Sequence, residues 1–122
     1  MSTTISGSNG IVFPDATSMQ TGQQAVKAWV NFNGTGTVSI RAGYNVASIT
    51  DNGAGSYAVN LTTALLDANY SATASCRGQS DGDSSSTIAG AGVLSTTIAN
   101  VYTKNSSNSL VDSSAVSVAI FR

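Results

Sequence analysis

The sequence contains no histidine and no glutamate among its 122 residues, and only 9% of the residues are charged. Without histidine, neither a Ser-His-Asp triad nor a Cys-His pair nor an imidazole metal site can form. The only side-chain carboxylates are those of Asp15, Asp51, Asp67, Asp81, Asp83 and Asp112. Most of them lie in turn-like contexts, where aspartate commonly bonds to its own backbone, and a glycoside hydrolase needs two carboxylates flanking a sugar. We therefore expect no enzymatic activity and no cofactor.

Basic residues are equally scarce, since five Lys and Arg stand against six Asp, which gives a net charge of -1. Nucleic-acid binding depends on an excess of Lys and Arg to displace counterions, so DNA and RNA are not expected partners. The opening "MSTTISGSNGIVF" has neither a basic start nor a long apolar run. We expect no signal peptide and no membrane insertion, and hence synthesis in a cytoplasm.

Cysteine occurs once, at Cys76, so no intrachain disulfide can form. The residue lies in the strand-like run "YSATASCR", where a small, buried apolar thiol is the simplest interpretation.

Serine, threonine, asparagine and glycine make up most of the polar sequence, a composition that favours strands and tight turns over surface helices. From Gln24 to Phe32 apolar and polar residues alternate, which predicts a strand with Trp29 on its more polar face. There Trp29 is expected to pack against a second sheet or another chain. Asn33-Gly34 then predicts a tight hairpin with positive φ.

Further strands are predicted at regular intervals down the chain. The segments are "TVSIRAGYNV", "VASIT", "SYAVNL", "YSATASCR", "TIAGAGVL", "STTIANVYTK" and "AVSVAIFR". Turn signals separate them, and this spacing is typical of an antiparallel sandwich or barrel. The predicted fold class is an all-β antiparallel β-sandwich, or a barrel-like jelly roll.

The first half of the chain, to about Tyr70, is similar to segments of bacteriophage tail-fibre proteins. "GIVFPDATSMQTGQQ" resembles their "I-x-F-P-D-G-T-x-Q-T" segments, with Ala16 where such segments usually have glycine. "KAWVNFNGTGTVSIRAGYNVASITDNGAGSYAVNLTTAL" resembles the Trp-Val-x-Phe-x-Gly modules at fibre C-termini. The second half has no motif of this kind.

The resemblance implies a homotrimer with residues 1–22 as a stem strand for trimerisation or virion attachment and residues 23–122 as the head domain. The apolar run at Ile11 to Phe13 cannot bury itself locally, so it is expected to meet copies of itself or a neighbouring head. The expected trimer-interface residues are Ile5, Ile11, Val12, Phe13 and Trp29. The alternative is that the segment folds back as an edge strand of its own domain.

The resemblance implies a virion tail protein that contacts other tail proteins and a bacterial surface glycan or protein. The expected contact residues are Asp81, Asp83 and Ser84 on one polar loop and Tyr102, Lys104 and Asn105 near another. Loops escape the packing constraint of strand faces, and hydroxyl, amide and aromatic groups suit carbohydrate. Both patches are equally explained as ordinary solvated surface. The carboxylates of Asp81 and Asp83 also offer oxygen ligands to a hard cation such as calcium. The alternative function is a structural virion component that does not bind a receptor.

Overall fold

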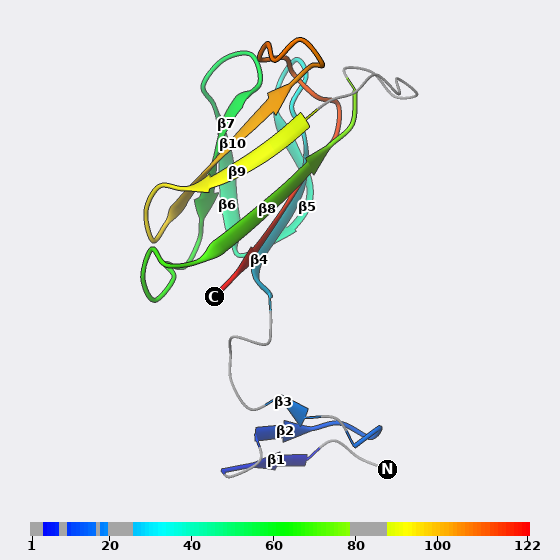
Figure 1. Ribbon diagram of the computed structural model, residues 1–122. Coiled ribbons are helices and arrows are strands. Elements are labelled where there is room, and N and C mark those ends of the chain that lie inside the picture. The colour runs from blue at the N-terminus through cyan, green and yellow to red at the C-terminus, as the bar shows by residue number, and fades with distance from the viewer. Residues whose placement is uncertain (1–3, 8–9, 17, 20–25, 79–87) are drawn as a thin grey trace.

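A computed structural model gives the fold and describes residues 4–7, 10–16, 18–19, 26–78 and 88–122 (Figure 1). All regular structure in these ranges is β-strand, which confirms the all-β prediction. Within the same ranges the chain contains no helix long and apolar enough to cross a membrane.

A small antiparallel sheet forms the N-terminal part, in the order β1-β2-β3. Its strands are β1 (Thr4–Ser6), β2 (Gly10–Val12) and β3 (Ser18–Met19), where the sequence predicted one stem strand. Ala16 N–H donates to the Phe13 carbonyl at 3.0 Å, and Ala16 has φ 68. Such a φ favours glycine, the usual residue of the similar segments. No strand of this sheet enters the head sheets, so the fold-back alternative is not what the described residues form.

The head consists of two four-stranded antiparallel sheets packed face to face (Figure 1). One sheet has the order β5-β4-β11-β8, with β4 at Val26–Asn33, β5 at Ser39–Tyr44, β8 at Ser71–Cys76 and β11 at Val116–Phe121. The other has the order β6-β7-β10-β9, with β6 at Val46–Asp51, β7 at Ser56–Leu61, β9 at Ile88–Val93 and β10 at Ile98–Lys104. This arrangement confirms the predicted β-sandwich.

The core lies between the two sheets and is built by the period-two alternation of the central strands. The core cluster consists of Ala28, Val30, Phe32, Tyr57, Val59, Leu61, Tyr70, Ala99, Val101, Val116, Val118 and Ile120. Phe32 and Tyr57 meet edge to face across the sheets, with ring centroids 5.2 Å apart. Cys76 packs against this core, and burial raises the pKa of its thiol, as expected for an unreactive cysteine.

The side chain of Tyr57 connects the core to the loops at one end of the head through hydrogen bonds. Its hydroxyl lies 3.0 Å from both the Gly34 carbonyl and Asp112 Oδ1, and the same Oδ1 accepts from Gly55 N–H at 2.9 Å. Burial, and then the hydrogen bond to Asp112, raise the pKa of Tyr57 to about 12. The hydroxyl is therefore neutral and donates, which holds three loop segments together.

The Asn33-Gly34 pair does not supply positive φ, so that part of the turn prediction is wrong. Asn33 is the last residue of β4, and its Oδ1 accepts from Thr35 N–H at 3.0 Å, while the left-handed position is Gly36, with φ 60. Gly34 is needed for another reason. A Cβ there would collide with the Tyr57 hydroxyl, so only glycine lets the loop approach that group.

Candidate functional site

The connecting loops of the head gather at two opposite ends (Figure 1). At one end Val26, where β4 begins, pairs with Phe121 of β11. At the other, which we call the far end, residues 34–38, 52–55 and 105–115 meet. Gly34 N–H donates to the Ser113 carbonyl and Thr103 N–H to the Gly55 carbonyl, both at 2.9 Å. The far-end loops are therefore fixed to one another and to the core.

Two of the predicted contact residues, Tyr102 and Lys104, share the outer face of β10 near the far end, because Val101 and Thr103 point into the core. They line a groove of about 670 Å³, which we call the Tyr102 groove. Its lining includes Ile88, Gly90, Tyr102, Lys104, Asn108 and Leu110. Tyr102 is 42% exposed and Leu110 is 43% exposed. An accessible ring thus lies beside aliphatic side chains and an ammonium group.

The space beside Tyr102 results from small neighbours in register with it. Tyr102 pairs with Gly90 on β9 and with Ser56 on β7. A Cβ built on Gly90 would meet no atom within 4 Å. The flank of the Tyr102 ring on the β9 side is therefore open.

Asn105 belongs to the turn beneath the groove and is not part of its lining. Its Oδ1 accepts from the N–H groups of Ser107 and Ser109, both at 3.0 Å, which closes the 105–109 turn. The amide in the groove is Asn108, whose Oδ1 accepts from Lys104 Nζ at 3.0 Å. Sequence reasoning missed Asn108, Ile88 and Leu110, because only the strand register and the turn bring them to Tyr102.

The other predicted positions are distributed over the chain. Asp81, Asp83 and Ser84 lie outside the described residues. In the N-terminal sheet Ile5 is 81% exposed and is paired with Ile11, while Ile11 and Val12 are half-buried and Phe13 is exposed. Trp29 lies on the outer face of β4 and is 40% exposed. These predicted trimer-interface residues therefore leave considerable apolar surface uncovered in the single chain.

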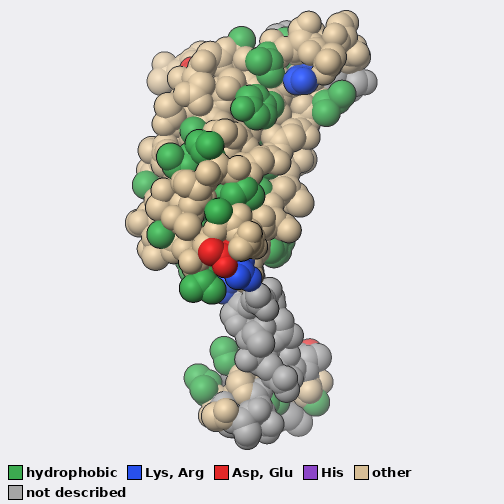
Figure 2. Space-filling view, turned by 60° about the vertical axis from the view of Figure 1, so that its left-hand side comes forward, with side chains coloured by type: hydrophobic (Ala, Val, Ile, Leu, Met, Phe, Trp, Pro, Cys, Tyr) green, Lys and Arg blue, Asp and Glu red, His purple; other side chains and the backbone are tan. Residues whose placement is uncertain are grey.

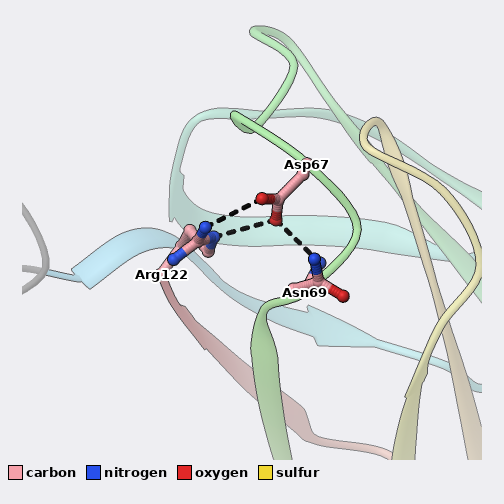
Figure 3. A network of polar contacts seen from close by, with 3 residues as sticks. All are labelled: Asp67, Asn69 and Arg122. Atoms are coloured by element: carbon pink, nitrogen blue, oxygen red, sulfur yellow. Dashed lines mark hydrogen bonds and ion pairs between the residues drawn. The ribbon is translucent and has the colours of Figure 1, made fainter.

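An ion pair fixes the end of the head opposite the Tyr102 groove (Figure 3). Asp67 accepts from Arg122 Nε at 2.9 Å and from Nη2 at 2.8 Å, and Asp67 Oδ1 also accepts from Asn69 N–H at 2.8 Å. The Arg122 guanidinium, and then the Asn69 N–H, lower the pKa of Asp67 to about 2. The pair joins the β7–β8 loop to the end of β11.

This ion pair predicts a dependence of stability on acid. The Asp67 pKa is about 2 in the folded chain and about 3.9 in an unfolded chain. The contribution of Asp67 is therefore present above about pH 4 and lost as the pH falls towards 2. We expect Asp67→Asn to lower the urea midpoint at pH 7, with a difference from the natural chain that shrinks between pH 4 and pH 2. A difference that stays constant down to pH 2 would contradict the role of the carboxylate charge.

Few charged side chains lie on the face of the head that Figure 2 shows. Separate hydrophobic patches lie there among backbone and other uncharged side chains. Among the described residues, no three His, Cys, Asp or Glu side chains come together to hold a metal ion. Comparison with protein-family models, with curated proteins and with solved structures found no match to this chain.

Proposed function

We propose that this protein is a non-enzymatic bacteriophage tail-fibre or tail-tip protein that attaches to the surface of the host bacterium. The Tyr102 groove is the observation that supports this proposal best. It lies near the far end of the head, away from Val26, where the chain arrives from the N-terminal segment. A surface placed there faces away from an attachment at the N-terminal side.

The groove also has the rigidity that a binding site needs. Thr103, between Tyr102 and Lys104, is fully buried, and its Oγ1 donates to the Val111 carbonyl at 2.6 Å. Its N–H is bonded to the Gly55 carbonyl. A ligand therefore meets side chains held on a fixed backbone, which lowers the ordering cost of binding. The ring, the ammonium and the amide suit a bacterial surface glycan or a polar protein surface.

The N-terminal sheet supports a homotrimer within the virion tail. Its three strands have two or three residues each, and sheets this small need a further packing surface to be stable. Ile5 and Phe13 are exposed in the single chain. Three copies packed on these side chains would bury them, and the same segment would be the contact with other tail proteins.

The proposal predicts that filling the Tyr102 groove reduces attachment. Gly90→Thr adds a side chain in the open space beside Tyr102, and threonine favours strands. We expect the thermal midpoint to stay the same or rise, and binding of the purified protein to host cells to fall at least about tenfold, a loss of about 1.4 kcal/mol. Pull-down on host cells with quantification of bound protein measures the effect.

Gly92→Thr is the matched control. Gly92 lies on the same outer face two residues along β9, a Cβ there also meets nothing within 4 Å, and it is not in the groove lining. This variant should bind cells like the natural chain. If the natural chain binds no cells but binds virions that lack it, the protein is a short fibre, collar or decoration subunit without receptor binding. Release of reducing sugar would instead identify an enzyme.

A further inference from the structure

The outer face of the β5-β4-β11-β8 sheet has two adjacent rows of side chains of different chemistry. One row runs Tyr44, Trp29, Ala119 and Thr73 across the four strands in register. The next row runs Ala42, Asn31, Ser117 and Ser75. An aromatic ring and a methyl group thus lie beside a line of amide and hydroxyl groups.

These rows enclose a shallow groove of about 330 Å³, which we call the Trp29 groove. Its outward-facing lining consists of Trp29, Asn31, Thr73, Ser75, Ser117 and Ala119. Among the residues that the structure describes, none in this lining is charged. The volume lies at the lower end of the roughly 300–1,000 Å³ usual for ligand sites. The groove belongs to a different sheet from the Tyr102 groove.

We propose that the Trp29 groove binds a neutral oligosaccharide. A pyranose has an apolar C–H face and a rim of hydroxyls, and the Trp29 groove offers an indole and the Ala119 methyl beside hydrogen-bonding side chains. Asn31 Nδ2 donates to Ser117 Oγ at 2.9 Å, and an amide so engaged still has a second N–H and a carbonyl oxygen to offer. Strands are spaced about 4.8 Å apart, close to the length of one sugar unit, so successive units can meet successive strands.

Charge and polarity select this ligand over the alternatives. An acidic glycan requires a cation, and the described residues of the lining include none. A second copy of the chain seated here would have to desolvate the Asn31–Ser117 pair and the exposed Ser75 and Thr73 hydroxyls at the centre of the contact, and such polar groups are costly to bury unpaired. A sugar instead pairs with them. This inference does not require the Tyr102 groove to bind a receptor.

Trp29 is the only tryptophan in the chain, so its fluorescence reports on this groove alone. The full chain is applied to an array of neutral and acidic microbial oligosaccharides, and the neutral compound retained best is then titrated while tryptophan emission is recorded. For the natural chain we expect retention of neutral compounds and a saturable emission change. Affinities of the variants are measured by isothermal titration calorimetry, which does not need the indole, and we expect a loss of at least about tenfold in Trp29→Ala. Trp29→Phe should recover part of the affinity, because a ring remains.

Phe121→Ala is the control, since Phe121 is an exposed aromatic residue of the same sheet that lies outside the groove lining. Thr73→Arg, at an exposed position, fills the groove if Trp29→Ala does not fold. Retention of no neutral compound, unchanged affinity in both groove variants, or a changed mass of Trp29→Ala in light scattering overturns the proposal. Cell binding that is lost in Gly90→Thr while no neutral oligosaccharide is retained would leave the proposed attachment function standing without this site.

Discussion

Replacing Gly55 by alanine is expected to cost the head most of its stability. A Cβ at Gly55 would collide with the Thr103 carbonyl and would lie 2.6 Å from Val111 N and 2.8 Å from Val111 O. All three are backbone atoms of the far end, which cannot turn aside as a flexible side chain can. We expect a loss of more than about 4 kcal/mol, a size confined to severe packing or backbone conflicts, measured by urea unfolding.

Gly36→Ala distinguishes the cost of the steric collision at Gly55 from the cost of placing alanine in a left-handed backbone conformation. Gly36 has φ +60 and Gly55 has φ +63, but a Cβ on Gly36 would meet nothing within 4 Å. Alanine at Gly36 should therefore cost only the left-handed conformation, about 1–2 kcal/mol. Equal losses in the two variants would show that the loops at the far end move apart readily, and would remove the rigidity argued for the Tyr102 groove.

The second large effect is expected in the oligomeric state of the protein in solution, measured as its mass by light scattering. If three copies pack through the N-terminal sheet, Ile5→Asp places three carboxylates near one another in an apolar contact, and their repulsion and desolvation oppose assembly. In a single chain the same change is mild, because Ile5 is 81% exposed. We expect light scattering to fall from three times the 12.3 kDa chain mass to the mass of one chain.

Leu66→Asp is the control. It tests whether placing a carboxylate at any exposed leucine or isoleucine lowers the mass as Ile5→Asp is expected to do. Leu66 is 85% exposed on the loop between β7 and β8, away from the N-terminal sheet in the sequence. Its replacement should leave the mass unchanged. A natural chain that scatters as a monomer at micromolar concentration would rule out the trimer, whatever the variants do.

The strands were predictable because the alternation is local. Val26, Ala28, Val30 and Phe32 line one face of the observed β4, and each later predicted segment overlaps an observed strand along most of its length. The partners of those strands were not predictable in the same way. Period two indicates which face of a strand is buried but not which strand lies beside it, so the central β4–β11 and β7–β10 pairs come only from the structure.

The candidate sites were also predictable only where they depend on neighbours along one strand. Two residues apart on one strand, Tyr102 and Lys104 had to share a face, and they do. Gly90 beside Tyr102 depends on the β9–β10 register, and Asn108 depends on a turn that Asn105 closes. Trp29 was correctly placed on the polar face, but the row of Asn31, Ser117 and Ser75 beside it joins three strands that are distant in sequence.

The pairing of β4 with β11 also determines when the head can fold. Asn31 and Ser117, which meet across that pair, are 86 residues apart. β4 is synthesised before β11, so the edge of β4 that bonds to β11 has no strand to pair with until β11 leaves the ribosome. Contacts between such distant segments slow folding, because a long loop must close first. The β5-β4-β11-β8 sheet therefore cannot be completed until β11 has been made.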